Sequence, residues 1–143
     1  MENSIISTKK KNNQYSVTPE DTIHANNLYT YKGYIKGIID GDTLWVTLDL
    51  GFDTWTTRKL RLRGINSPGI ETEEGKKARD FFIKQCSPCP FIIVKTHWRD
   101  KCNRYLADIF YDKGDTDPKA VTEKGKYINQ LLLDKHLAQK YTG

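Results

Sequence analysis

The sequence predicts an α+β protein that is mainly β, namely a five-stranded barrel with one helix between the third and fourth strands and a second, C-terminal helix. Three observations support this prediction. Five runs of residues alternate apolar and polar side chains, which is typical of half-buried antiparallel strands. Two other segments space their apolar residues three and four positions apart, which is the period of an amphipathic helix. These elements follow the order three strands, helix, two strands, helix.

Residues 1–28 differ in composition from the rest of the chain. They are rich in Asn, Ser, Thr and Lys, show no sustained period and include Pro19, which predicts a flexible polar arm or linker. The three lysines of this arm balance its three acidic residues, so the net charge of +5 belongs entirely to residues 29–143. We expect residues 29–143 to form one domain, and the arm is a candidate link to a further domain or a protein partner.

The first three strands are predicted between residues 29 and 62. Alternating apolar residues mark them: Tyr29, Tyr31, Ile35 and Ile39, then Leu44, Val46, Leu48 and Leu50, then Leu60 and Leu62. Asp40-Gly41 is a strong hairpin signal between the first two strands, and residues 51–54 allow a second turn. The three runs are therefore expected to form an antiparallel meander.

A helix is predicted to begin after Thr72, which can cap its N-terminus, and to end before Pro88. Its apolar face consists of Ala78, Phe81, Phe82 and Cys86. Two more strands are expected at residues 91–98 and 104–111, joined by a tight turn. A polar loop over 112–125 precedes the second helix, whose apolar residues are Ile128, Leu131 and Leu132. This order of elements is that of the OB fold, a barrel that commonly binds oligonucleotides.

The overall charge and hydropathy restrict the functional classes. An excess of 23 Lys and Arg over 18 Asp and Glu fits a polyanionic partner such as DNA or RNA. No stretch reaches the roughly 18 to 20 apolar residues of a membrane span, and the first residues are too polar and short for a secretory signal. We therefore expect a cytoplasmic protein without membrane contact, whose three cysteines are reduced.

Three short segments bear on chemistry. In Asp40-Gly41-Asp42-Thr43, two carboxylates flank a glycine and can converge on a hard cation such as Ca²⁺, although an ordinary hairpin turn has the same composition. A later strand alternates cations with leucines, so that three cations share the face opposite the leucines: Lys59, Arg61 and Arg63. On that face they can bind nucleic acid or simply face solvent. Arg104 follows a turn directly, and its planar guanidinium suits a phosphate group.

Together, residues 38–44, 61–68 and 104–108 resemble the thermonuclease (staphylococcal-nuclease-like) family in order and spacing. The resemblance covers about Tyr29 to Tyr141 and implies Ca²⁺-dependent hydrolysis of DNA and RNA. It implies that Asp42 is the directly ligating aspartate and that Asp40 is its outer-shell neighbour. The resemblance further implies that Arg61 and Arg104 grip the scissile phosphate, where fixed guanidinium groups stabilise developing negative charge.

The sequence departs from this family pattern at two positions. Where the family has Asp-Thr-Pro-Glu, this chain has Asn66, Ser67, Pro68 and Gly69. Asn66 still offers a carbonyl oxygen, and at Ser67 the family uses the backbone carbonyl, so Ca²⁺ binding is expected to be weak or lost. Gly69 lacks the glutamate that positions or deprotonates the attacking water. Glu71 can replace that glutamate only if the loop folds back.

Three functions remain open at this point. The first is a nucleic-acid-binding domain with weak or absent cleavage, whose groove consists of Lys59, Arg61, Arg63 and Arg104 and whose partner we expect to be single-stranded. The second is an active Ca²⁺-dependent nuclease with a rearranged site. The third is a non-catalytic protein-interaction domain. Aromatic residues on and between the strands can stack bases or pack in the core: Tyr29, Tyr31, Tyr34, Trp45 and Trp55.

Cysteine and histidine residues give little indication of a further site. Cys86 and Cys89 have the CxxC spacing of zinc and redox sites, but Cys86 lies on the apolar face of the predicted helix. A strand of about 26 Å separates Cys89 from Cys102, too far for one zinc ion. We therefore interpret the cysteines as structural, and neither His24 nor His136 has a recognisable catalytic partner.

Overall fold

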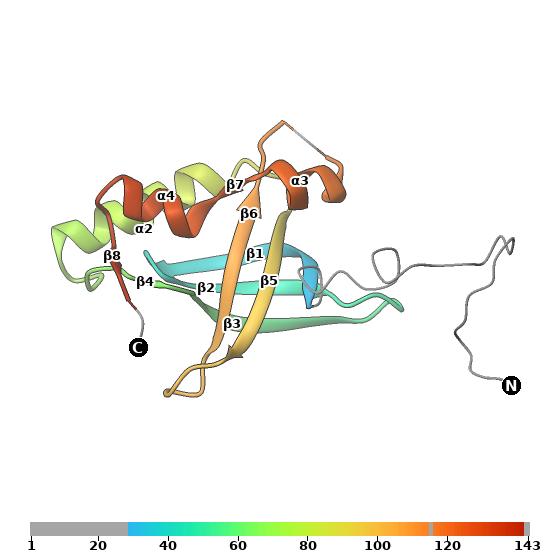
Figure 1. The fold of residues 1–143 in the computed structure, drawn as a ribbon, viewed down its shortest axis with the longest axis horizontal. Helices are drawn as coiled ribbons and strands as arrows, with labels where there is room; N and C mark the ends of the chain where they lie inside the picture. Colours follow the sequence, from blue (N-terminus) through green and yellow to red (C-terminus); the bar gives the residue numbers. More distant parts are fainter. Residues whose placement is uncertain (1–28, 115, 142–143) are drawn as a thin grey trace, which may run out of the picture.

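The protein, described here by a computed structural model that covers residues 29–114 and 116–141, is built around a closed barrel (Figure 1). Strands β1 (Thr30–Asp40), β2 (Thr43–Asp49) and β3 (Trp55–Leu62) form an antiparallel meander. Strands β5 (Ile92–Arg99) and β6 (Tyr105–Tyr111) form an antiparallel pair. β1 pairs with β5, and β3 pairs in parallel with β6, which closes the barrel. The predicted fold class is confirmed, whereas the predicted arm lies outside the described residues.

Helix α2 (Glu73–Cys86) lies between the third and fourth barrel strands, as predicted. The side chain of Thr72 accepts a hydrogen bond of 2.9 Å from the backbone N–H of Gly75, which satisfies one of the free donors at the start of the helix. Ala78, Phe82 and Cys86 are buried in the core, whereas Phe81 is only partly buried. The apolar face that the spacing predicts therefore packs against the barrel.

The predicted polar loop over 112–125 contains a short helix, α3 (Pro118–Lys124). Its signal is local: Asp117 caps the helix by accepting a hydrogen bond of 3.1 Å from the backbone N–H of Lys119, and Pro118 occupies the first helical turn. Val121 is the buried residue that anchors α3. A helix of this length presents too little apolar periodicity for the pattern to reveal it. Helix α4 (Ile128–Asp134) follows where the second helix is predicted.

Three strands of two residues each were not predicted, because so short a segment has no period. β7 (Lys126–Tyr127) adds to the edge of β6. β4 (Ile65–Asn66) pairs with β8 (Gln139–Lys140), and the backbone N–H of Tyr141 donates to the carbonyl of Gly64 at 2.9 Å. This pairing brings the C-terminal end of the described chain beside the end of β3.

The inward face of β1 changes phase along the strand. Ile39, which the alternation assigns to the same face as Ile35, is 36% exposed, whereas Ile38 is 7% exposed and lies in the core. Register shifts between Ile35 and Gly37 and between Ile38 and Asp40 cause this change, because each bulge inserts a residue without a partner. The prediction for Ile39 is therefore wrong. Among the described helices, none is long and apolar enough to cross a membrane.

Candidate nucleic-acid interface

A hollow of about 440 Å³ opens where the β1–β2 turn, β3 and the loop before α2 meet. Its lining includes every residue that the resemblance assigns to catalysis or metal binding: Asp40, Asp42, Arg61, Asn66, Ser67 and Arg104. Thr43, Pro68, Gly69 and Tyr141 complete the lining. Motifs that are more than 60 residues apart in the sequence, such as Asp40 and Arg104, therefore meet in one place.

Strand register explains this convergence. Thr43 on β2 pairs with Arg61 on β3, so the β1–β2 turn lies beside Arg61. Arg61 in turn pairs with Leu106 on β6, close to Arg104. Gly41 permits the tight approach of the turn to the neighbouring elements, because a Cβ there would lie 2.6 Å from the Cβ of Ala78 and 2.7 Å from that of Ser67. No residue with a side chain fits at position 41 without displacing backbone.

Asp42 is buried and fully engaged in hydrogen bonds. Its Oδ1 accepts from the Thr43 hydroxyl at 2.8 Å, and its Oδ2 accepts from the backbone N–H of Ser67 at 2.9 Å. Burial by itself would raise the pKa of Asp42. The hydrogen bonds from Asp40, Ser67 and Thr43, together with the charge of Arg61, outweigh it and lower that pKa. Asp42 is therefore an anion at neutral pH.

Asp40 behaves in the opposite way. Its Oδ1 accepts from the backbone N–H of Asp42 at 3.1 Å. Burial, followed by the neighbouring carboxylate of Asp42, raises the pKa of Asp40. The two carboxylates are thus inequivalent, and the pair releases its second proton less readily than its first.

Arg61 is a buried cation, 4% exposed. Its Nη2 donates to Oδ1 of Asn66 at 2.9 Å and lies 3.5 Å from Oδ2 of Asp42, while Nη1 donates to the carbonyl of Leu62 at 3.3 Å. The ring of Tyr141 covers the guanidinium, with 4.9 Å between the guanidinium carbon and the ring centroid. These contacts fix the orientation of Arg61 and keep water away from it.

Arg104 lines the same hollow but is held by a different carboxylate. Its Nη2 lies 2.9 Å from Oδ2 of Asp100, and its Nε donates to the same oxygen at 3.0 Å. Asp100 also accepts from the backbone N–H groups of Cys102 and Arg104, at 2.9 Å and 3.0 Å, and so holds the β5–β6 turn together. The position of Arg104 is therefore built into the turn.

The other two predicted nucleic-acid-binding cations differ from Arg61. Lys59 is exposed and pairs with Trp45 on β2. Arg63 is bound by Asp108, whose Oδ2 accepts from Nη2 of Arg63 at 3.0 Å. The three cations lie on one side of the strand, as predicted, but only Lys59 among them is free of an ion pair in the described structure.

A second hollow of about 520 Å³ adjoins the first, because both are lined by Arg61 and Tyr141. Its other lining residues are mostly basic or belong to the β5–β6 turn: Arg63, Gly64, Arg99, Asp100, Lys101 and Leu106. The side chains of Arg61 and Tyr141 therefore form part of the wall of both hollows. The cations that line the two hollows come from two segments of the chain, Arg61 with Arg63 and Arg99 with Lys101 and Arg104.

Asp108 is a buried carboxylate that the sequence analysis missed. It is 4% exposed and binds side chains from several elements around it: Arg63, His97, Tyr127 and Asn129. Nε2 of His97 lies 2.6 Å from its Oδ2, and the Tyr127 hydroxyl donates to its Oδ1 at 2.5 Å. Burial, followed by the hydrogen bond to Asp108, raises the pKa of Tyr127. A lone aspartate in a strand gives no sequence signal for such a cluster.

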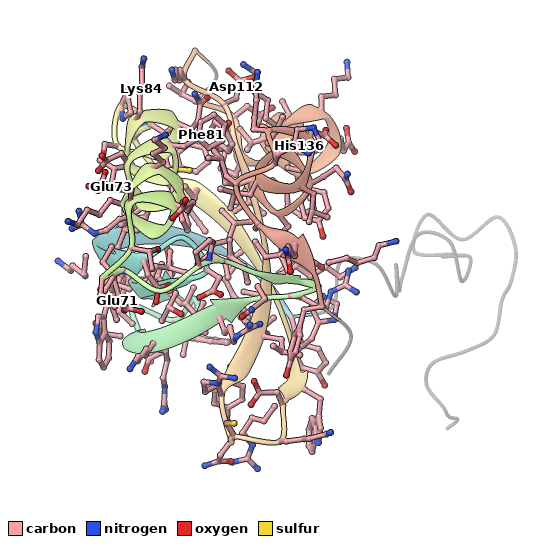
Figure 2. All side chains as sticks on the ribbon, turned by 90° about the vertical axis from the view of Figure 1, so that its left-hand side faces the viewer. Glu71, Glu73, Phe81, Lys84, Asp112 and His136 are labelled. Carbon is pink, nitrogen blue, oxygen red and sulfur yellow. The ribbon has the colours of Figure 1, made fainter. Side chains whose placement is uncertain are left out.

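Glu71 folds back over Gly69, as the sequence analysis required for it to replace the missing glutamate. A Cβ at position 69 would collide with Oε2 of Glu71. The Thr72 hydroxyl donates to the carbonyl of Gly69 at 2.7 Å, which holds the loop in this shape. Figure 2 shows Glu71 on the loop that leads into α2. A carboxylate therefore lies beside Gly69, which lines the first hollow, although Glu71 is not itself one of the lining residues.

The three cysteines are free and differ in burial, with Cys86 in the core, Cys89 partly buried and Cys102 exposed. Burial raises the pKa of the Cys86 thiol well above its usual range. Within residues 29–114 and 116–141, no three His, Cys, Asp or Glu side chains gather closely enough to hold a metal ion. His136 lines a third hollow of about 590 Å³ with Glu74 and Lys77, and this hollow shares Asn66, Ser67 and Pro68 with the first. His24 lies outside the described residues.

The donor set of the first hollow fits Ca²⁺ poorly in this arrangement. Ca²⁺ takes six to eight oxygen ligands. The hollow offers the carboxylates of Asp40 and Asp42, but Oδ1 of Asn66 accepts a hydrogen bond from Arg61. The Arg61 guanidinium faces Asp42 as well, and its positive charge opposes a cation there.

Comparison with protein-family models and with curated proteins finds no match to this chain. The fold and the site place the protein in a structural class: it is an OB-fold-like barrel with a surface hollow that is lined by a buried arginine.

Proposed function

We propose that this domain binds the phosphate backbone of single-stranded DNA or RNA at Arg61, as a thermonuclease-like domain with weak or absent cleavage. The observation that carries the proposal is the buried, oriented guanidinium of Arg61 in a hollow that also holds Arg104. A planar guanidinium donates two parallel hydrogen bonds to a phosphate. The Asp42 carboxylate, 3.5 Å from Nη2 of Arg61, offsets part of the Arg61 charge, and Arg104 brings a second guanidinium to the same hollow.

The second hollow favours a ligand that is longer than a single phosphate group. Arg99 and Lys101 line it, and it joins the first hollow through Arg61 and Tyr141. A charged groove that follows a flexible backbone is the usual device for binding single strands without sequence preference. The net charge of +5 agrees with this partner.

We propose that calcium binding is weak or lost, because Asn66 engages Arg61 with the oxygen that a cation would need. Positions 66 and 69 also lack the two carboxylates of the family that the chain resembles. The three free cysteines agree with a reducing compartment such as the cytoplasm.

Slow phosphodiester cleavage is the second candidate function, and the position of Glu71 favours it. A carboxylate beside Gly69 is a group that can accept a proton from an attacking water. In this candidate Arg61 and Arg104 bind the phosphate and Glu71 acts as the general base.

Fluorescence anisotropy with labelled single-stranded DNA and RNA tests the binding proposal. We expect the affinity to fall steeply with rising salt, and Arg61→Ala to weaken binding at least roughly tenfold, since charge-assisted hydrogen bonds are worth about 1.5 to 3 kcal/mol. Lys84→Ala is the matched control, because Lys84 is exposed near the opposite end of α2 from Glu71 (Figure 2). Equal effects of the two variants, or no salt dependence, would contradict the proposal.

Digestion of the same strands with Ca²⁺ or with a chelator separates the two candidates. We expect little or no cleavage by the parent protein. Robust cleavage that Asp42→Ala and Glu71→Gln both abolish would establish the second candidate function and refute the proposal that cleavage is weak or absent.

A further inference from the structure

The outer surface of the β1–β2–β3 meander carries exposed aromatic rings that continue from the first hollow. We call this surface the aromatic face and define it by Tyr34, Trp45 and Trp55 with the flanking Lys32 and Lys59. Directly paired residues of antiparallel strands lie on one side of a sheet, and so do alternate residues of each strand. The pairs Thr43 with Arg61, Trp45 with Lys59, Thr47 with Thr57 and Asp49 with Trp55 therefore share one surface.

The rings of this face are not part of the core. Trp45 is 42% exposed, Trp55 is 53% exposed and Tyr34 is 37% exposed, whereas the inward residues of the same strands, such as Val46 and Leu60, are buried. Of the two roles that the sequence left open for these three aromatic residues, packing in the core does not apply. Because so much ring surface is open to solvent, each ring can contact a ligand without rearrangement of the barrel.

One flank of Trp45 is open because its partner on β1 is Gly37. A Cβ at Gly37 would meet nothing within 4 Å, so no neighbouring group fills the space beside Trp45. On the other flank Trp45 pairs with the exposed Lys59. A flat ring with an open flank and a cation beside it presents a stacking surface next to a phosphate-binding charge.

The charges of the face suit a polyanion. The Nζ of Lys32 lies 5.9 Å from the ring centroid of Tyr34, and Lys59 extends from β3. The one carboxylate among the paired positions named above, that of Asp49, accepts a hydrogen bond from the backbone N–H of Gly51 at 2.9 Å and so serves the turn. Aromatic rings interleaved with cations favour the bases and phosphates of nucleic acid over a neutral apolar protein surface.

We propose that the aromatic face stacks the bases of a single strand whose phosphate binds at Arg61. This inference rests on the proposed function. Successive rows of the face are roughly 7 Å apart along the strands, so the surface extends about 20 Å from Arg61 to Trp55. Stacking on these rings does not depend on base identity, and it adds affinity only for a strand long enough to reach beyond the hollow.

Binding of oligothymidylate of increasing length, compared with thymidine 3′,5′-diphosphate, tests the inference. Trp45→Ala and Trp55→Ala are each expected to weaken binding of the long oligonucleotide roughly 5- to 150-fold, since stacking on an aromatic ring contributes about 1 to 3 kcal/mol per base. Binding of the diphosphate is expected to stay unchanged in both variants. The oligonucleotide is expected to quench tryptophan fluorescence in the parent, and less in each variant.

Trp98→Ala is the matched control, because Trp98 is 82% exposed on β5, outside the aromatic face. A loss of affinity in this control as large as in the Trp45 and Trp55 variants would contradict the inference. If the parent binds both ligands through Arg61 while Trp45→Ala and Trp55→Ala bind the oligonucleotide normally, the inference fails and the proposed function stands. If the parent binds neither ligand, both fail.

Tryptophan accessibility in the free protein shows whether protein, rather than nucleic acid, covers the aromatic face. We expect acrylamide to quench the parent tryptophans freely in the absence of nucleic acid. If Trp45 and Trp55 are shielded, replacing either of them lowers the acrylamide-quenchable fluorescence less than replacing Trp98 does. Such shielding would mean that another part of the chain or a second copy covers the face. That result would overturn the inference.

Discussion

The carboxylate of Glu71 lies so close to Gly69 that a Cβ on residue 69 would collide with Oε2 of Glu71. The loop thus places a carboxylate beside a position that has no side chain of its own. The contact also determines what happens when a side chain is added there. Because Glu71 is exposed and its side chain is flexible, it can move aside, but two carboxylates would then compete for one place.

The first prediction concerns restoration of cleavage. Gly69→Glu together with Asn66→Asp returns both missing carboxylates, and Glu71→Gln removes the repulsion between positions 69 and 71. We expect this triple variant to show Ca²⁺-dependent cleavage of single-stranded DNA or RNA that exceeds that of the parent by about 10² to 10⁴, the usual value of a general base. Adding Asp42→Ala to the triple variant is the control and is expected to remove the gain.

The second prediction concerns Tyr141, whose ring covers the guanidinium of Arg61. Tyr141→Ala is expected to lower the free energy of unfolding by about 1 kcal/mol and to weaken oligonucleotide binding severalfold, because Arg61 loses its cation–π partner. Tyr141→Phe keeps the ring and is expected to match the parent in chemical denaturation and in anisotropy. A loss in the Phe variant as large as in the Ala variant would show that the ring contact is unimportant.

The third prediction concerns Asp108, the buried partner of Arg63 and Tyr127. Asp108→Ala is expected to lower the free energy of unfolding by about 3 to 5 kcal/mol, because the donors around it lose their acceptor and Arg63 loses its counter-charge. Urea denaturation measures the change. Asp134→Ala is the control, because Asp134 lies at the end of α4 in an exposed hydrogen bond to Gln130, and we expect a change within about 0.5 kcal/mol.

The fourth prediction concerns stability at alkaline pH. Burial raises the pKa of both Tyr111 and Tyr127 above 10, and the hydrogen bond to Asp108 adds to the effect at Tyr127. The folded protein therefore keeps two protons that the unfolded chain releases as the pH rises above 10. Each group lowers the free energy of unfolding by about 1.4 kcal/mol per pH unit in that range.

Urea denaturation at a series of alkaline pH values measures this slope, and tyrosinate absorbance reports the ionisation. Tyr127→Phe is expected to make the slope above pH 10 shallower by about 1.4 kcal/mol per pH unit, whatever its effect on stability at neutral pH, while Tyr111 and the buried Cys86 thiol contribute equally in both proteins. An unchanged slope in this variant would mean that Tyr127 ionises normally in the folded protein.

Much of this structure follows from short-range patterns in the sequence. The alternation of apolar residues predicts β2, β3, β5 and β6, and Thr72 with the spacing from Ala78 to Cys86 predicts α2. These signals are local, since a strand or a helix repeats its environment every two or every three to four residues. Even α3, which was not predicted, has a local signal in Asp117 and Pro118.

By itself the sequence determined the order of the elements and the residues able to bind a phosphate, whereas only the tertiary structure decided which of them meet. The register of β3 against β2 and β6 brings Arg61 beside Asp42 and next to Arg104, and buries it under Tyr141. Barrel closure likewise binds Arg63 to Asp108 and leaves Trp45 facing solvent. Burial and pairing depend on contacts between segments far apart in the chain, and no pattern of neighbouring residues encodes those contacts.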